Sequence, residues 1–160
     1  MAQLALFQDL SPSQLSLILA LVEICKFPEN QAIFEQGEQA DHLFIVISGE
    51  VIVRYKPYDG PDIVVARIGP GGVFGWSAAL GRSVYTSAAI SDCPSEVFRF
   101  KARDLQKLYE QNPEIGNIVL DRLATVIAER LRSTHNQVLA ILTQGIDLDG
   151  EHLRKSGQNE

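Results

Sequence analysis

The sequence predicts a mainly β domain flanked by helices, and three observations lead to this fold class. From Ala32 to Phe100 the chain consists of short apolar runs separated by glycines, which is typical of an all-β sandwich or barrel. On both sides of this region, apolar residues recur at helical spacing instead. The 160 residues, 46% of them hydrophobic, suffice for one domain with a single core but not for a second large domain.

A helix is predicted near the N-terminus, within a segment that runs from Leu4 to Ile24. Ser11 is a suitable N-cap and Pro12 a suitable first helical residue. The residues that follow at helical spacing are Leu15, Ile18, Leu19 and Val22. We expect Pro28 to close this segment.

Seven short strands are predicted between the helical regions. They are Ile33–Phe34, Leu43–Ile47, Val51–Tyr55, Ile63–Ile68, Val73–Phe74, Thr86–Ile90 and Glu96–Phe100. Ser48-Gly49 is a hairpin signal between two of them, and Asp59-Gly60 suggests a second, looser turn.

Two helices are predicted after the strands. Arg103 to Glu110 forms a short one, and Asn112-Pro113 provides the N-cap and first residue of a long one at 113–142. Along the long helix, apolar positions alternate spacings of four and three, as in a coiled-coil seam: Leu120, Ala124, Ile127, Leu131, Thr134, Val138 and Ile141. A core-facing helix would show a similar stripe. We favour a homodimer through this helix, because the β region ahead of it looks self-sufficient.

Composition excludes several classes of function. The formal net charge of −6 argues against general attraction to nucleic acid or anionic membranes. No apolar run is long enough to span a membrane, and no signal peptide is recognisable, so we expect a cytoplasmic protein. Three scattered histidines and two unrelated cysteines predict no metal site, no cofactor and no enzyme of the metal-dependent jelly-roll type.

The segment from Phe27 to Val53 resembles the opening strands of cyclic-nucleotide-binding domains. The resemblance is carried by Ile33-Phe34, Gly37-Glu38, Ala40-Asp41 and Ser48-Gly49-Glu50-Val51, and it continues through Gly71–Leu80 and Tyr85–Phe100. It implies a double-stranded β-helix, or jelly-roll barrel, with an N-terminal helix and a phosphate-binding-cassette helix. The long C-terminal helix resembles the dimerisation helix of catabolite-activator-type (Crp/Fnr-like) bacterial regulators. We therefore expect one domain over residues 1–143.

The resemblance also implies a ligand site, in which this chain departs from the family pattern. The family cassette reads Phe-Gly-Glu-x-Ala-Leu and is followed by an arginine. Here Trp76 stands in place of the ribose-binding glutamate and Tyr85 in place of the phosphate-binding arginine. The candidate ligand-binding residues are Phe74, Gly75, Trp76, Ser77, Ala78, Tyr85, Thr86, Ser87, Thr134 and His135. Without both charged contacts, binding of cyclic AMP or cyclic GMP by the usual mechanism is expected to be weak or lost.

Several roles remain open from the residues alone. Trp76 and Tyr85 could fill the vacated pocket or could line a pocket for a less charged, unidentified effector. Arg82 is either a replacement phosphate ligand or a solvated loop residue. Thr134 matches the family's base-contacting threonine, but a polar seam residue also fixes coiled-coil register. His135 departs from the family's serine and could be a surface residue or a pH-sensitive contact.

The leading hypothesis is a stand-alone dimeric regulatory domain whose output is conformational and reaches a protein partner. The residues after 143 are polar, so we expect a disordered tail at 144–160 and no DNA-binding domain. Nucleic-acid binding by this chain alone is not expected. The alternatives are a ligand-free docking dimer, or the effector half of a transcription regulator whose helix-turn-helix lies elsewhere.

Overall fold

The computed structural model describes residues 5–133 of the chain. The chain divides into two compact units, residues 1–124 and residues 125–160. The first unit contains every strand described, and the second is described only as the helical residues 125–133. Within the described part of the chain, no helix combines the length and the apolar character that a membrane crossing needs.

The N-terminal residues form the short 3-10 helix η1 (Ala5–Phe7) and helix α1 (Pro12–Leu19). Helix α1 starts as predicted, because the Ser11 hydroxyl accepts the Gln14 N–H at 3.3 Å and the Gln14 side chain accepts the Ser11 N–H at 2.9 Å. The predicted continuation of the helix to Ile24 is wrong. Strand β1 (Val22–Phe27) occupies those residues and pairs along its whole length with β8 (Ser95–Lys101), and this pairing overrides their helical spacing.

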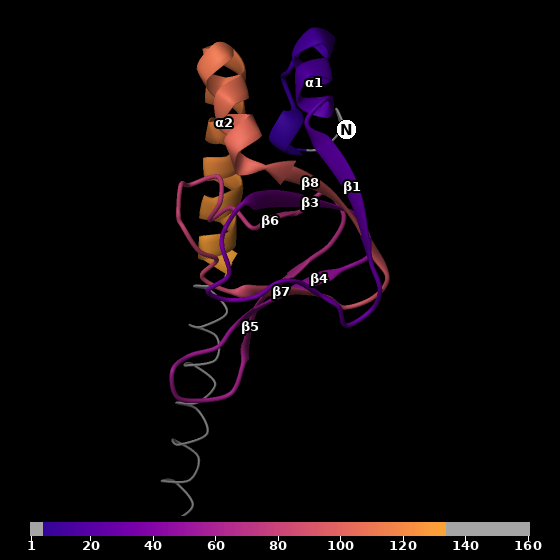
Figure 1. Ribbon diagram of the computed structural model, residues 1–160, viewed down its shortest axis with the longest axis vertical. Helices are drawn as coiled ribbons and strands as arrows, with labels where there is room; N and C mark the ends of the chain where they lie inside the picture. The colour runs from indigo at the N-terminus through magenta and orange to yellow at the C-terminus, as the bar shows by residue number, and fades with distance from the viewer. Residues whose placement is uncertain (1–4, 134–160) are drawn as a thin grey trace, which may run out of the picture. The chain divides into compact units, whose positions relative to one another are not determined.

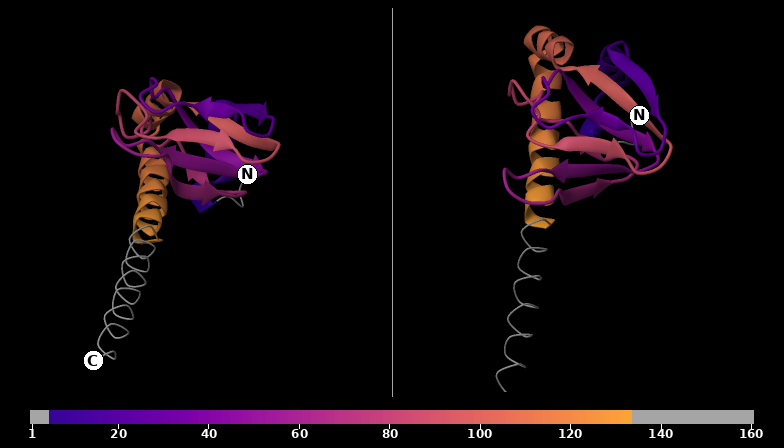
Figure 2. Two further views of the ribbon diagram at one scale, coloured as in Figure 1. Left: turned by 90° about the horizontal axis from the view of Figure 1, so that it is seen from below. Right: turned by 60° about the horizontal axis from the view of Figure 1, so that its bottom comes forward.

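Eight strands are described, and they form the two antiparallel sheets of the predicted jelly-roll class (Figure 1). The strand order is β1-β8-β3-β6 in the first sheet and β2-β7-β4-β5 in the second. Figure 2 gives two further views of the strands. The remaining bounds are β2 (Ala32–Phe34), β3 (His42–Ser48), β4 (Val51–Tyr55), β5 (Ile63–Ile68), β6 (Val73–Phe74) and β7 (Ala88–Ser91). All seven predicted strands are therefore present, several with the predicted bounds.

The hairpin predicted at Ser48-Gly49 is wrong. Strand β3 pairs with β6 and β8, whereas β4 pairs with β5 and β7, so this turn carries the chain from one sheet to the other. Gly49 has a φ of +86°, and a Cβ there would lie 2.7 Å from the Pro94 carbonyl oxygen. A short glycine turn looks the same in sequence whether its two strands pair or separate. The turn predicted at Asp59-Gly60 is confirmed, since β4 and β5 form a hairpin there.

The core between the two sheets is aromatic at its centre. The ring of Phe74 lies 5.0 Å from that of Phe44 and 6.1 Å from that of Phe34, measured between centroids. Valines from both sheets surround these rings with no exposed surface: Val46, Val51 and Val97. This close packing leaves little freedom to the residues that follow β6.

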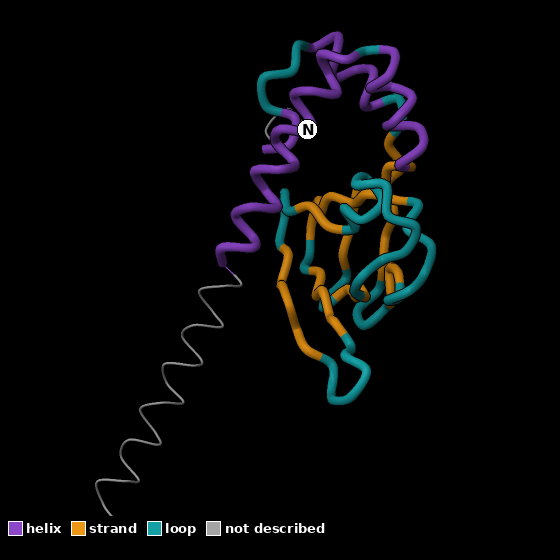
Figure 3. Tube along the Cα trace, turned by 90° about the vertical axis from the view of Figure 1, so that its left-hand side faces the viewer, coloured by secondary structure: helices purple, strands orange, loops and turns teal. Residues whose placement is uncertain are grey.

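Two helices follow the strands in the predicted order. Helix α2 (Ala102–Gln111) ends at Gln111. The carbonyl of the next residue, Asn112, accepts the Gly116 N–H at 3.2 Å and so begins the C-terminal helix. That helix is described over residues 113–133. The rest of the predicted dimer helix and the predicted tail at 144–160 lie outside the described residues. Helices α1 and α2 lie at one end of the strands (Figure 3).

The outer face of the first sheet is covered by the N-terminal segment. Phe7 packs edge-on against Phe100 of β8 with ring centroids 5.9 Å apart. Asp9 forms an ion pair with Arg122 of the C-terminal helix. The N-terminal segment therefore contacts both the sheet and the third turn of that helix.

Candidate functional site

The cassette region begins directly after β6, where the backbone turns at Gly75. This glycine has a φ of +71°, and a Cβ would lie 2.9 Å from both the His42 carbonyl oxygen and the Phe44 ring. Only glycine fits that conformation and that close approach. The helix predicted for this region is replaced by consecutive turns at residues 76–81, with a single helix-like hydrogen bond from the Leu80 N–H to the Trp76 carbonyl at 3.0 Å.

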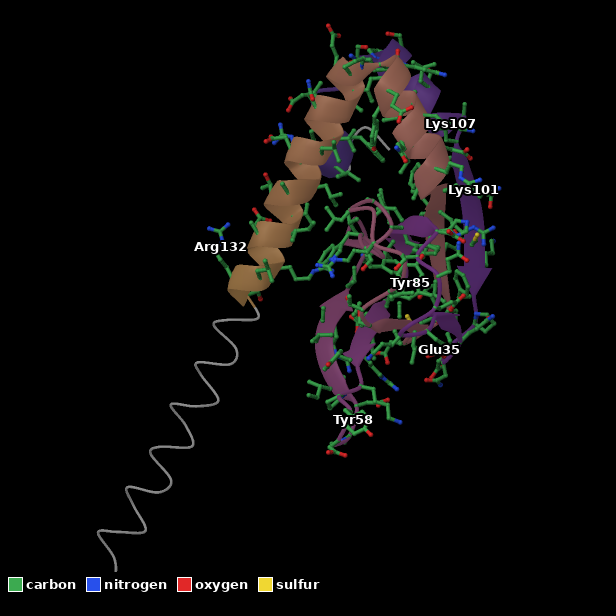
Figure 4. All side chains as sticks on the ribbon, turned by 60° about the vertical axis from the view of Figure 1, so that its left-hand side comes forward. Glu35, Tyr58, Tyr85, Lys101, Lys107 and Arg132 are labelled. Carbon is green, nitrogen blue, oxygen red and sulfur yellow. The ribbon has the colours of Figure 1, made fainter. Side chains whose placement is uncertain are left out.

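Tyr85 lies inside the barrel rather than on its surface, as Figure 4 shows. Its side chain is 4% exposed, and its ring stacks on Phe34 with centroids 3.7 Å apart and planes 15° from parallel. The hydroxyl donates to the His42 carbonyl at 2.8 Å and accepts the His42 N–H at 3.1 Å. The ring of Tyr85 thus closes one side of the core, and its hydroxyl oxygen forms hydrogen bonds with the N–H and the carbonyl of His42 in β3.

The phenol of Tyr85 carries no charge at neutral pH. Burial is the main cause that raises its pKa to about 12. The neighbouring imidazole of His42 is also favoured in its neutral form, because burial and the nearby Arg99 guanidinium lower its pKa. Tyr85 therefore offers a neutral phenol where the family pattern has a cation, and the carboxylates of Glu38 and Asp41 act on it as well.

The remaining predicted residues differ in their surroundings. Phe74, Ser77 and Ala78 are buried, Trp76 and Ser87 are half-buried, and Thr86 is exposed. Phe74 and Tyr85 are brought together, since the rings of both stack on Phe34. Arg82 is exposed, and its backbone N–H donates to the Ser77 carbonyl at 2.9 Å. Thr134 and His135 lie outside the described residues.

Sequence reasoning missed the two partners that hold Tyr85 in place. Phe34 supplies the stacking ring, and His42 supplies the backbone N–H and carbonyl. Phe34 was part of the motif that carries the family resemblance, but nothing in that motif indicates contact with position 85. The positions are about fifty residues apart in the chain, and only the fold brings them together.

A cavity of about 610 Å³ lies between the cassette turns and the two helices that follow the strands. It is bordered by residues 78–81, by α2 and by the first turns of the C-terminal helix. Of the predicted ligand-binding residues that the structure describes, it includes only Ala78. This cavity joins the cassette to both helices and was not predicted.

The predicted seam residues within the described range present apolar surface. Leu120 is 44% exposed and Leu131 is 66% exposed, while Ala124 is exposed and Ile127 half-buried. Thr134, Val138 and Ile141 lie outside the described residues. Leu120 and Leu131 therefore leave apolar side chains exposed at two of the predicted seam positions.

The cassette region holds neutral and small side chains. No group of three or more histidine, cysteine or acidic residues that could hold a metal ion occurs among the described residues. The cassette combines a glycine turn, buried small residues and a neutral phenol.

Comparison with known proteins identifies relatives of this chain. Residues 24–112 match the family model described as the cyclic nucleotide-binding domain. The chain is 27% identical over 142 residues to a CRP-like cAMP-activated global transcriptional regulator of Mycobacterium tuberculosis. That match covers 89% of this chain and 62% of the relative, so the chain spans about three fifths of the relative's length.

Two solved structures are also similar. A cyclic nucleotide-binding domain from Methylobacillus flagellatus KT gives a TM-score of 0.78 at 21% identity, over 84% of this chain and 75% of that one, and shows the fold alone. A putative cyclic nucleotide-binding protein from Geobacter metallireducens GS-15 gives a TM-score of 0.70 at 28% identity, over 79% of this chain and 91% of that one.

Proposed function

Because this chain belongs to the cyclic nucleotide-binding domain family, we propose that it is a regulatory domain that acts as a homodimer without the family's charged nucleotide contacts. Its relatives are named as transcriptional regulators, which supports a regulatory rather than a catalytic role. In this proposal, binding of cyclic AMP or cyclic GMP is weak or lost, and the domain responds to another effector or partner.

The observation that carries this proposal is the position of Tyr85. The family pattern has a phosphate-binding arginine at this place, whereas Tyr85 is buried against Phe34 with its hydroxyl bonded to His42. A neutral phenol cannot offset a phosphate charge. Trp76, in place of the ribose-binding glutamate, offers only an N–H donor and no acceptor for a ribose hydroxyl.

The output that fits this geometry is a conformational change. The cassette turns at 78–81, helix α2 and the first turns of the C-terminal helix border one cavity. A shift of the turns, or a molecule bound in the cavity, would therefore change the surroundings of both helices. This arrangement supports a domain that relays the state of the cassette to its helices.

Titration with cyclic AMP or cyclic GMP is expected to give no saturable heat at micromolar concentrations. Loss of a charge-assisted phosphate contact costs about 2–5 kcal/mol, or roughly 30-fold to several-thousand-fold in affinity. Isothermal titration calorimetry of the full chain measures this directly. A dissociation constant in the micromolar range for either nucleotide would contradict the proposal.

The double variant Trp76→Glu/Tyr85→Arg restores both family side chains and serves as the matched gain-of-function test. Tyr85 is a core residue, so circular dichroism must first establish that the variant folds. If the double variant binds cyclic AMP and neither the wild type nor Trp76→Glu does, the weak nucleotide binding of the wild type is due to these two positions. Trp76→Glu is the control, because it restores the glutamate while the phosphate position keeps its neutral phenol.

The homodimer is expected to depend on Leu131. Replacing this 66% exposed leucine by glutamate places like charges in the seam and should yield a monomer. Leu17→Glu is the matched control, because Leu17 is 44% exposed on α1, outside the seam. Sedimentation equilibrium of wild type and Leu17→Glu should report twice the chain mass of 17.7 kDa. If the wild type is monomeric at tens of micromolar, or if Leu131→Glu is still a dimer, the homodimer does not form through this seam.

A further inference from the structure

An apolar groove lies between α2 and residues 113–123 of the C-terminal helix, with a volume of about 610 Å³. Figure 4 shows these two helices diverging from the turn that joins them, with side chains between them. Its floor is aliphatic, formed by Leu43, Leu105, Val119 and Leu123, all of which are buried. The volume lies in the range of about 300–1,000 Å³ that is typical of small-molecule sites.

The groove is open to solvent along its rim. Leu80 from the cassette turns is 54% exposed and Leu120 from the C-terminal helix is 44% exposed. At the junction of the helices, Gly116 allows close approach, because a Cβ there would lie 2.9 Å from Tyr109 Cβ. The two helices therefore meet tightly at one end and leave apolar walls accessible towards the other.

The charges of the lining are separated along α2. Arg103, Gln106 and Glu110 are spaced by three and four residues, so they form one stripe on the rim. Arg103 is exposed near the start of α2 and has no ion-pair partner among the described residues. Glu110, about two turns further on, accepts a hydrogen bond from the Gln106 amide at 3.0 Å. The cationic end also coincides with the positive end of the helix dipole.

We propose that this groove binds an amphiphilic carboxylic acid, with its alkyl chain between the two helices and its carboxylate on Arg103. The aliphatic floor favours an alkyl chain, since burial of that alkyl chain removes apolar surface from water. The guanidinium presents paired N–H donors that match a carboxylate, and it is the only cation among the residues that line this groove. Glu110 repels a carboxylate from the opposite end and thereby orients the ligand.

The length of the groove determines which alkyl chain length the ligand should have. Ala102 and Glu110 are eight residues apart, so the α2 side of the groove measures about 12 Å. An extended chain of single bonds advances about 1.2 Å per bond, as the polypeptide backbone itself does. An alkyl chain of about ten to twelve carbons therefore spans the groove, and dodecanoate is the appropriate probe.

Tyr109 also favours an acid in this position. It lines the groove, and no described residue accepts a hydrogen bond from its hydroxyl. Burial raises the pKa of Tyr109, so the phenol remains a neutral donor and adds no negative charge. The groove thus contains an aliphatic floor, one free cation among its lining residues and one free neutral donor.

The test is calorimetric titration of the full chain with dodecanoate, below the concentration at which it forms micelles. We expect saturable 1:1 binding per chain, with a dissociation constant in the micromolar range. Arg103→Gln should weaken dodecanoate binding about three- to tenfold. Lys107→Gln is the matched control, because Lys107 is on the same helix but does not line the groove, and it should leave binding unchanged. Dodecanol should bind more weakly than dodecanoate and should not respond to Arg103→Gln.

Ala79→Phe fills the groove from the cassette turns and should weaken dodecanoate binding at least tenfold. If this variant fails to fold, as judged by circular dichroism, Arg103→Gln with its control still decides the question. Absence of saturable binding to the wild type would overturn the proposal. Equal binding by the wild type and Arg103→Gln would overturn it as well. The nucleotide and dimer tests above substitute Trp76, Tyr85 and Leu131, none of which lines the groove, so their failure is distinguishable from failure here; Leu120 belongs to both the predicted seam and the groove.

Discussion

Replacing Tyr85 by alanine is expected to lower the free energy of unfolding by about 3–5 kcal/mol. The ring is 4% exposed and stacks on Phe34 with centroids 3.7 Å apart, so its removal leaves a cavity at one side of the core. Urea denaturation followed by the fluorescence of Trp76, the single tryptophan, measures the change. Protein concentration must be held constant, because the stability of a dimer depends on it.

Two further substitutions separate the contributions of ring and hydroxyl. Tyr85→Phe keeps the ring but leaves the His42 N–H and carbonyl without their partner, which should cost about 1–3 kcal/mol. Tyr58→Ala is the control, because Tyr58 is fully exposed on the loop between β4 and β5 and should change stability by less than about 0.5 kcal/mol. A cost below about 1 kcal/mol for Tyr85→Ala would show that the ring does not fill the core.

Replacing Gly49 by alanine is expected to destabilise the domain by about 2–5 kcal/mol. Two effects combine at this position. A side chain at a φ of +86° is strained, and its Cβ would collide with Ser95 and with the Pro94 carbonyl oxygen. Ser95 is 3% exposed and donates to the Cys93 carbonyl at 2.7 Å, so it cannot move away without losing that bond.

Gly37→Ala isolates the backbone effect from the collision. Gly37 has nearly the same φ, +85°, but a Cβ there would meet nothing within 4 Å. This variant should lose only about 1–2 kcal/mol, which is the cost of the left-handed conformation. Urea denaturation of both variants gives the difference. Equal losses would mean that close packing at the corner between the sheets contributes nothing.

The strands could be predicted because their local pattern is strong. Val51–Tyr55, Ile63–Ile68 and Val73–Phe74 are runs rich in β-branched or aromatic residues, and their bounds agree with the structure. Val22–Phe27 was misassigned because its apolar spacing also suits a helix. Its partner, Ser95–Lys101, lies about seventy residues away in the chain, and no local pattern reveals that pairing.

The candidate site could also be predicted only in part from the sequence. The departure from the family pattern at positions 76 and 85 is visible in the sequence, and so is the glycine at 75. That the Tyr85 ring stacks on Phe34 and its hydroxyl bonds to the His42 backbone is visible only in the fold. The groove between α2 and the C-terminal helix also requires three separate segments to meet.

By itself, the sequence determined a mainly β domain between helices and seven of its eight described strands in order. The family resemblance added the jelly-roll class and the absence of the family's charged side chains at two positions. These features depend on local periodicity, on turn residues and on side-chain identity, all of which are visible in the amino-acid sequence. Only the tertiary structure decided which strands pair, that Gly49 turns a corner between sheets, and that Tyr85 faces inward. Those outcomes depend on burial and hydrogen bonding between distant segments, whose free energies exceed local preferences.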